Sequence, residues 1–388
     1  MGGGGGEQPQ LRGALGNANR LKLGTFSTNL DGGGAITTMP GILHPEWGRV
    51  RAIAKTADRI GLEVFVPVAR WKGYGGITNY AAASFDTFCW AAGLAAVTEH
   101  AYIFSTCHVP TIHPIVAAKQ LATIDHISGG RSGINIVGGW FRPEMEMFGR
   151  KLLEHDRRYD MAEEWTDILL SLWTTDEEFD YAGEFFTINA GFSEPKPLQR
   201  PRPPMMNAGG SGRGLDFAAR YCDVLFAYVQ DDEDFDDAKA SVDRVREKAR
   251  SYGRDVQVWT QAYVVCRDSE AEAKAFYDHY VHELGDQDAA DRLMHHMGLE
   301  TQHLGPKNFE RARERFMAGW GGVGLVGTAE QIVERFVRIA DAGYAGCVLL
   351  FPLWEEGLER FERDVLPLME QAGLREPFIT GAGRSSAG

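Results

Sequence analysis

The segment 123–140, TIDHISGGRSGINIVGGW, constrains the fold of this sequence more than any other. A helical pattern that ends at Ile127 runs into the breaker cluster 128–131, whose glycines can adopt the left-handed turn that stops a helix. Residues 132–137 are mostly apolar and predict a short, fully buried strand. Asn135 interrupts that strand, and a buried amide must find a partner. At the C-terminal end of a barrel strand, that partner is often a ligand.

Strands and helices alternate along most of the chain, which predicts a parallel sheet. The expected strands are residues 21–29, 62–68, 101–107, 132–137, 204–208, 223–229, 256–266 and 347–351. The expected helices are residues 45–61, 84–100, 114–127, 155–173, 211–220, 232–253, 329–342 and 357–371. Eight such units indicate an α/β fold of the TIM (β/α)8 barrel type with insertions. An open doubly wound sheet is the alternative, and it is disfavoured because no G-x-G-x-x-G follows the first strand.

One domain is expected to fill residues 21–374, with insertions near 176–202 and 268–325. The first insertion contains a small β excursion, and the second is expected to be helical to about residue 315. Residues 1–20, which begin with a glycine run, and residues 375–388 are expected to be disordered tails.

Composition argues against several kinds of partner. The net charge of −14 and the pI of about 5.3 argue against nucleic acid or an anionic membrane as a partner. No run of about 18 apolar residues occurs, so no membrane span is expected. The five cysteines are widely spaced and form no C-x-x-C pair, which fits a reducing cytoplasm.

In a TIM barrel, functional residues lie at the C-terminal ends of the strands and in the loops that follow. This rule nominates Asn29, Arg70, Thr106, His108, Asn135, Trp140, Asn207, Ser211, Tyr228, Gln230 and Trp354. The paired histidines near residues 279–282 and 295–296 lack an H-E-x-x-H motif and a carboxylate cluster, so no metal site is expected.

A glycine-rich turn and an Arg–Tyr pair are candidates for binding an anion. The turn AGGSGR at 208–213 joins a strand to a helix N-terminus, where backbone N–H groups and the helix dipole attract phosphate. Ser211 can add its hydroxyl. Arg158 and Tyr159, which open another helix, can contact the same anion. An ordinary glycine turn and a solvated arginine face are the alternatives.

Four segments carry a resemblance to a known family: 122–131, 135–140, 158–159 and 208–211. They resemble the luciferase-like, flavin-dependent monooxygenases, and most closely the branch that holds pyrimidine monooxygenase and dimethyl sulfone monooxygenase. The resemblance extends over about residues 23–374. It implies a TIM barrel that binds FMN as FMNH2 and uses O2 as a co-substrate.

The resemblance also implies roles for individual residues. It implies flavin contacts at Ala69, Arg70, Asn135, Glu144, Arg158, Tyr159, Gly210 and Ser211. It implies that dioxygen is held by Val66, Thr106 and Asn135. Two of these positions depart from the pyrimidine enzyme, because Arg70 stands in place of a lysine and Val66 in place of a leucine. The alternative for Thr106 and Asn135 is that both are core residues bonded to backbone.

The implied reaction is oxygenation of a small organic molecule, with oxidative cleavage of a C–N or C–S bond. An alkanesulfonate is disfavoured, because Thr260 and Ala262 stand where the alkanesulfonate enzymes carry an Arg and a His. Aromatic pocket candidates that suit a small neutral substrate are Trp71, Tyr74, Trp140, Trp259 and Trp320. The resemblance leaves open whether oxygen is carried on N5 or C4a of the flavin.

The resemblance implies two kinds of partner. One is a separate NAD(P)H-dependent flavin reductase that supplies FMNH2. The other is further copies of the same chain, in a homodimer or homotetramer. Two rival functions remain. An F420-dependent oxidoreductase uses the same barrel, but it needs a basic channel for the oligoglutamate tail of its cofactor. A flavin-binding barrel without catalysis belongs to a different class altogether.

Overall fold

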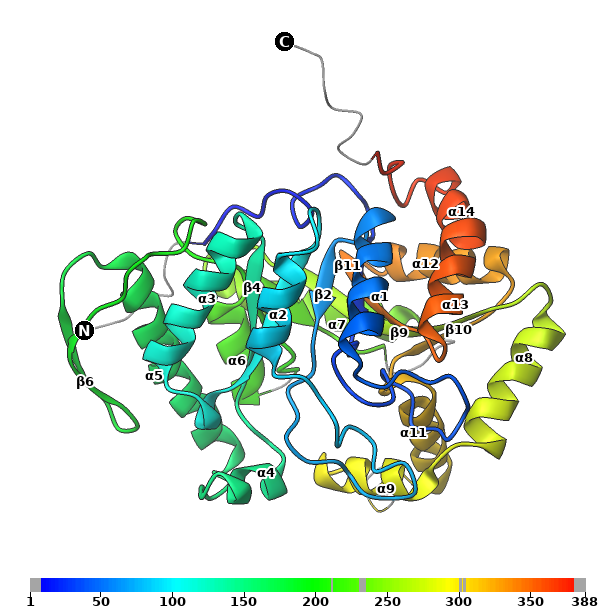
Figure 1. Ribbon diagram of the computed structural model, residues 1–388, viewed down its shortest axis with the longest axis horizontal. Coiled ribbons are helices and arrows are strands. Elements are labelled where there is room, and N and C mark those ends of the chain that lie inside the picture. Colours follow the sequence, from blue (N-terminus) through cyan, green and yellow to red (C-terminus); the bar gives the residue numbers. More distant parts are fainter. Residues whose placement is uncertain (1–7, 211, 230–234, 300–301, 303–304, 380–388) are drawn as a thin grey trace, which may run out of the picture.

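The computed structural model describes residues 8–210, 212–229, 235–299, 302 and 305–379. Within these residues, eight parallel strands close into a barrel (Figure 1). In spatial order they are β1 (Lys22–Phe26), β2 (Val64–Val66), β3 (Tyr102–His108), β4 (Ser132–Val137), β7 (Met205–Asn207), β8 (Val224–Phe226), β9 (Gln257–Cys266) and β11 (Gly346–Leu350). The ring closes because β11 pairs with β1 and β9 pairs with both β8 and β11. The TIM-barrel prediction is therefore confirmed.

Helices surround the barrel (Figure 1). The helices that follow the barrel strands are α1 (Trp47–Arg59), α2 (Thr87–Ala95), α3 (Pro114–Ser128), α5 (His155–Thr174), α6 (Gly212–Tyr221), α7 (Phe235–Ser251), α12 (Ala329–Asp341), α13 (Trp354–Arg360) and α14 (Leu366–Gln371). The loop after β4 adds α4 (Arg142–Met147). The insertions add α8 (Glu270–Asp278), α9 (Gln287–His296), α11 (Pro306–Gly319) and the hairpin of β5 (Phe179–Ala182) and β6 (Thr187–Gly191). Short helical turns complete the chain at Val109–Thr111, His279–Glu283 and Phe361–Val365.

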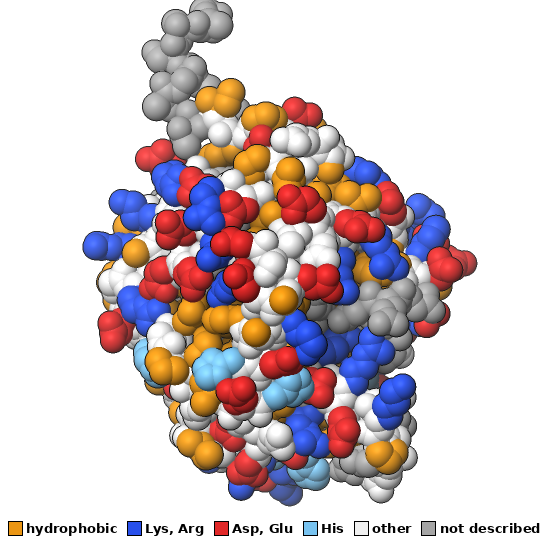
Figure 2. Space-filling model, turned by 90° about the vertical axis from the view of Figure 1, so that its right-hand side faces the viewer, with side chains coloured by type: hydrophobic (Ala, Val, Ile, Leu, Met, Phe, Trp, Pro, Cys, Tyr) orange, Lys and Arg blue, Asp and Glu red, His pale blue; other side chains and the backbone are white. Residues whose placement is uncertain are grey.

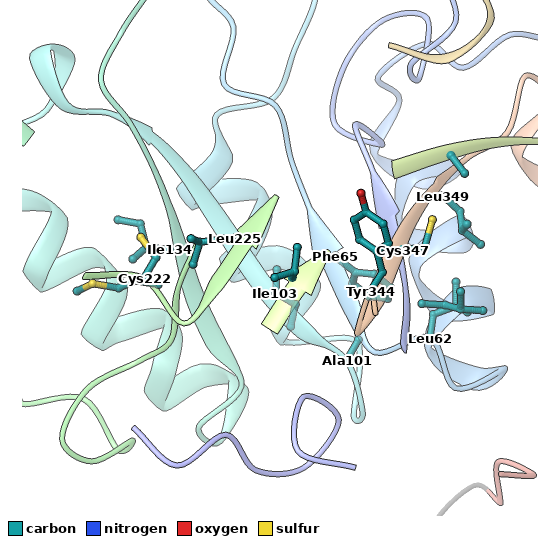
Figure 3. Packing of buried hydrophobic residues seen from close by; sticks show 14 of the residues in the cluster. Leu62, Phe65, Ala101, Ile103, Ile134, Cys222, Leu225, Tyr344, Cys347 and Leu349 are labelled. Atoms are coloured by element: carbon teal, nitrogen blue, oxygen red, sulfur yellow. The ribbon is translucent and has the colours of Figure 1, made fainter. Parts of the chain in front are cut away.

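Side-chain alternation divides the core into two layers. Tyr102 and Phe104 point into the barrel, where they join an interior cluster. Ile103 lies on the outer face of the same strand, and it packs beneath the helices with Phe65 and Ile134 (Figure 3). The same alternation turns the last residues of each strand either into the barrel mouth or toward the helices.

The turn before β4 is built as the sequence predicted. Gly129 ends α3 with a φ of 66°, and the N–H of Gly130 donates to the carbonyl of Asp125 at 2.8 Å. The buried Asp125 carboxylate accepts from the Ser132 hydroxyl at 3.0 Å and from the Gln199 side chain at 2.7 Å. One carboxylate thus fixes the helix end, the strand start and the first insertion together.

A strand was missed within the segment assigned to the second insertion. Residues Val323–Gly327 form β10, which pairs in parallel with Ala262–Cys266 of β9. Its partner edge is available because β8 ends opposite Trp259, while β9 continues to Cys266. The glycine-rich sequence VGLVG resembles a loop, and only a partner distant in sequence makes it a strand.

The chain ends differ from the disorder expected for residues 1–20 and 375–388. Leu15 is fully buried, and the Gln257 side chain donates to its carbonyl at 2.9 Å. Arg375 is also buried and forms an ion pair with Glu63 at 2.7 Å. Residues 8–20 and 375–379 therefore pack on the N-terminal end of the barrel, and the remainder of each tail lies outside the described residues.

The surface carries charges of both signs. Figure 2 shows acidic and basic side chains interspersed on one side of the molecule. The pair Lys274–Asp278 on α8, with an N–O distance of 2.7 Å, is of the exposed i,i+4 kind that contributes only about 0.3–0.5 kcal/mol. Among the described helices, none combines the length and apolarity needed to cross a bilayer.

A buried charge cluster holds the start of β8. The Asp223 carboxylate is fully buried and accepts from Arg202 Nη1 at 2.6 Å and from Arg254 Nη2 at 2.8 Å. It also accepts from the backbone N–H of Met205 at 2.8 Å, which ties β8 to β7. Such a cluster is stable only while every charge keeps its partner.

We expect Asp223→Ala to lower the free energy of unfolding by about 3–5 kcal/mol, because two buried guanidinium groups lose their carboxylate. Urea denaturation measures the change. The matched control is Asp341→Ala, whose side chain is 58% exposed and pairs with Arg20, and we expect a change within about 0.5 kcal/mol. Equal losses in the two variants would contradict the importance of burial in this cluster.

Candidate active site

A cavity of about 730 Å3 opens at the C-terminal ends of the barrel strands. A second cavity of about 890 Å3 lies at the opposite end, between residues 9–19 and 376–379. Although the second cavity is larger, enzymes of this architecture place their chemistry at the C-terminal ends of the strands. The 730 Å3 cavity is therefore the candidate active site.

Most of the residues nominated from the sequence meet in this cavity. Its wall includes Val66, Ala69, Arg70, Thr106, Asn135, Arg158, Tyr159 and Gly210. Further nominees on the wall are His108, Trp140, Asn207 and Tyr228. Ser211 and Gln230 lie outside the described residues. Asn29 and Trp354 instead bond to backbone, donating to the carbonyls of Val68 at 2.8 Å and Gly33 at 3.1 Å.

Thr106 and Asn135 lie opposite each other on β3 and β4, as the strand register requires. Asn135 Nδ2 donates to Thr106 Oγ1 at 3.2 Å, and the Thr106 hydroxyl donates to the Pro67 carbonyl at 2.5 Å. Asn135 Oδ1 is buried without a partner in the described part of the chain. Because the Thr106 proton is already used, Asn135 is the residue of this pair whose amide can meet a molecule in the cavity.

Glu144 lies behind Arg70 rather than on the cavity wall. It is fully buried, and its Oε2 accepts from Arg70 Nη1 at 2.8 Å. Its Oε1 accepts from the backbone N–H groups of Trp71 at 2.7 Å and Lys72 at 3.3 Å. His108 Nδ1 lies 3.6 Å from the same Oε2 that binds Arg70. Glu144 thus binds Arg70 and contacts His108, and both of these side chains line the cavity.

The glycine turn and the Arg–Tyr pair are brought together at one end of the cavity. Gly209, Gly210, Arg158 and Tyr159 all line it there. Arg158 Nη1 donates to the carbonyl of Gly139 at 3.1 Å, and its Nε is buried without a partner among the residues described. Burial lowers the pKa of Arg158 from its ordinary value and raises that of Tyr159. The N–H of Gly209 already donates to Asn207 Oδ1 at 2.6 Å, so the half-buried Arg158 guanidinium and the N–H of Gly210 are the groups suited to an anion.

Close packing fixes the position of Tyr159. A Cβ atom on Gly214, in the first turn of α6, would lie 2.7 Å from the Tyr159 hydroxyl. Only glycine at this position lets the ring approach the helix that follows the turn.

Two of the five aromatic candidates, Trp140 and Trp320, line the cavity. Tyr74 is buried beside Trp140, with ring centroids 6.4 Å apart and nearly parallel planes. Trp259 belongs to the interior cluster of the barrel. Trp71 is 47% exposed.

On β9, Gln261 faces the cavity, whereas Thr260 and Ala262 alternate to the other face. Gln261 follows Trp259 on the interior side and donates to the Trp320 carbonyl. Thr260 and Ala262, on which the sequence argument against an alkanesulfonate rests, therefore do not lie on the cavity wall.

Several wall residues were not nominated, among them Leu152, His155, Gln261, His296 and Met297. His155 precedes Tyr159 by one helical turn, and the two rings lie 5.2 Å apart, so helical spacing could have found it. His296 had no local signal, because α9 reaches the cavity only through the packing of the insertion. No group of three metal-ligating side chains is found within the described ranges.

Comparison with known proteins assigns this site to a family. Residues 21–346 match the family model for the luciferase-like monooxygenases. The chain belongs to the luciferase-like monooxygenases. The resemblance noted from the sequence motifs is thereby confirmed.

Two relatives of this luciferase-like chain cover nearly all of it. A protein described as an FMNH2-dependent dimethylsulfone monooxygenase from Pseudomonas putida is 30% identical over 361 residues, or 90% of this chain and 96% of the relative. The pyrimidine monooxygenase of Escherichia coli is 30% identical over 371 residues, or 93% and 95%. Among solved structures, a riboflavin lyase shares the fold with a TM-score of 0.81 and 20% identity, over 92% of this chain and 93% of the other.

His108 gives the stability of this luciferase-like monooxygenase a dependence on pH. Burial first, and then the Arg70 guanidinium, hold the pKa of His108 well below its ordinary value of 6.5. The unfolded chain binds a proton here at a higher pH than the folded chain, so the free energy of unfolding falls as pH drops below about 6.5. We expect His108→Gln to make this decline shallower in urea titrations between about pH 5 and 7.5. Identical slopes in the two proteins would contradict the assignment.

Proposed function

We propose that the protein uses FMNH2 and O2 to cleave a C–N or C–S bond of a small organic molecule oxidatively. It receives FMNH2 from a separate NAD(P)H-dependent flavin reductase and acts in the cytoplasm as a homodimer or homotetramer. As a member of its family the protein is a flavin-dependent monooxygenase. The observation that carries the proposal is one cavity whose wall combines a candidate anion site with the Asn135 amide, whose buried Oδ1 has no partner among the described residues.

The residues present fit FMN. The cavity volume of about 730 Å3 lies within the range of roughly 300–1,000 Å3 that holds small ligands and cofactors. Arg158, Tyr159 and the backbone N–H of Gly210 would hold the phosphate. Ala69 and Arg70 would lie beside the rest of the flavin. Arg158 Nε and Asn135 Oδ1 are buried and have no partner in the described part of the chain, and a bound molecule can satisfy such polar atoms.

Reduced FMN supplies the electrons that activate O2 when it is bound. The chain's own contribution is to orient the reactants and to exclude water. Val66 and Phe226, which are 1% and 8% exposed, form an apolar floor that continues into the barrel interior. The N–H of Asn135 Nδ2 that does not bond to Thr106 can act as a donor where negative charge develops, and such a donor is most effective in a dry pocket.

The substrate class is inferred from the aromatic and polar side chains of the cavity wall. Trp140 and Trp320 provide apolar area, and Arg70, His108 and Gln261 provide a few polar groups, as is typical of sites for small polar molecules. One relative is described as acting on dimethylsulfone and another on pyrimidines, and both relatives are monooxygenases. These two substrates are the basis for proposing C–S or C–N cleavage.

An anaerobic titration tests the cofactor first. We expect the protein to bind FMNH2, and we expect Arg158→Ala to weaken this binding roughly 10- to 100-fold, because a charge-assisted contact to phosphate is lost. Riboflavin, which lacks the phosphate, should bind both proteins equally. The matched control is Arg157→Ala, which removes an exposed neighbour paired with Asp160 and Glu184 and should leave the affinity unchanged.

The titration also separates the rival functions. Tighter binding of F420 than of FMNH2 would overturn the proposed reaction and leave the barrel as a deazaflavin oxidoreductase. An equal effect of Arg158→Ala on FMNH2 and riboflavin would remove Arg158 from the phosphate site.

Asn135→Ala tests the catalytic role of the buried amide. We expect turnover to fall about 100-fold, as for the loss of one preorganised donor, while FMNH2 affinity changes only a few-fold. The measurement is product formation from the substrate found in a screen of pyrimidines and sulfones, together with release of H2O2. Full turnover in this variant would contradict the catalytic role of Asn135. A wild-type protein that binds flavin normally but turns over no substrate would favour a non-catalytic barrel.

A further inference from the structure

His108 is a buried histidine on the cavity wall, and the proposed activation of O2 gives it no specific role. It follows Thr106 by two residues on β3 and therefore lies on the same interior face, where it lines the cavity. Its side chain is 2% exposed. Its Nδ1 is buried, has no hydrogen-bond partner among the described residues, and lies 3.6 Å from Glu144 Oε2.

The position of Glu144 favours the tautomer of His108 that carries its proton on Nδ1. The carboxylate accepts N–H groups from Arg70, Trp71 and Lys72, so its oxygens act as acceptors. A lone pair on Nδ1 would be repelled by Oε2, whereas an N–H there is attracted. The ring is neutral near neutral pH because burial and Arg70 hold its pKa well below the ordinary value. With the proton on Nδ1, the nitrogen left to meet a molecule in the cavity is Nε2, and it is an acceptor.

Arg70 places donors beside this acceptor. Its Nη1 is held by Glu144, and its guanidinium lies 4.7 Å from the ring centroid of Trp140. Its Nε is buried without a partner in the described part of the protein. Since Arg70 and His108 both face Glu144 Oε2, their relative position on the wall is set by one atom.

We propose that Arg70 and His108 select the substrate as a pair. The substrate presents an oxygen to Arg70 and an N–H or O–H group to Nε2 of His108, and Glu144 is the positioning residue behind both. A cyclic amide or imide matches this wall, because it carries a carbonyl oxygen and an N–H on adjacent atoms. A sulfone offers only acceptors and leaves Nε2 buried and unpaired, which costs affinity.

This inference rests on the proposed function and narrows it from C–N or C–S cleavage to a C–N substrate of the amide class. It also makes a specific statement about His108 that does not depend on turnover. The tautomer can be observed in 15N-labelled protein by long-range correlation of ring protons and nitrogens, with His108→Gln identifying the signals. We expect a neutral ring protonated on Nδ1, and a proton on Nε2 would overturn the proposal.

Binding to the oxidised FMN complex, which does not turn over, tests the selection. The two probes are uracil, which has both carbonyl and N–H groups, and dimethyl sulfone, which has only acceptors. We expect uracil to bind more tightly. His108→Ala should weaken uracil binding roughly tenfold and leave dimethyl sulfone within about twofold. His108→Gln, whose Oε1 can take the place of Nε2, should recover most of the loss.

His113→Gln is the matched control, because His113 lies outside the cavity at the start of α3 and should affect neither probe. If His108→Ala does not fold, His108→Met, which keeps the volume and lacks the acceptor, replaces it. Uracil that binds no more tightly than dimethyl sulfone, or equally well to all His108 variants, would overturn the inference. FMN affinity is measured first. If the wild-type protein does not bind FMN, the proposed function is wrong. If FMN binds normally but uracil binding does not depend on His108, only this inference is wrong.

Discussion

The buried ion pair between Glu144 and Arg70 is the interaction on which the cavity wall depends. It joins α4, which carries Glu144, to the loop after β2 and, through His108, to the end of β3. Removing both charges from water is costly, and the additional backbone donors from Trp71 and Lys72 offset part of that cost. Because either charge left alone would be stranded in a dry site, the pair fixes the geometry of the wall more than it adds to stability.

Alternation along the strands determines how much of the barrel can become an active site. On β3, Phe104 belongs to the apolar interior, whereas Thr106 and His108 on the same face reach the cavity. One strand thus changes from apolar to polar within four residues as it approaches the mouth. A shift of one residue would exchange this face with the helix-packed face that holds Ile103. The chemistry is therefore confined to the last inward-facing positions of each strand.

The sequence predicted the barrel well because its signals are local: periodicity, glycine breakers and a strand at 132–137 that matches the structure residue for residue. Strand 62–68 was predicted too long, because Pro67 has no N–H for the ladder and the chain leaves the sheet to line the cavity. Motifs nominated Asn135 and Arg158 on the wall. Gln261 was not nominated, although it follows the candidate Trp259 by two residues on the same face of β9. The strand β10 was missed because its pairing partner is distant in the sequence.

The net charge of the chain and the charges on the cavity wall have opposite signs. The chain has a net charge of −14, yet the cavity wall carries the guanidinium groups of Arg70 and Arg158. An acidic surface does not steer an anion over long distances, and charges separated by more than about 8–10 Å are largely screened in physiological salt. A phosphate bound at the proposed site would therefore gain its affinity from short contacts inside the cavity, where half-burial of Arg158 weakens screening. The Glu144 carboxylate neutralises Arg70 from behind, so Arg158 is the stronger of the two attractions, and an anionic group is drawn to the glycine turn rather than to the wall beside His108.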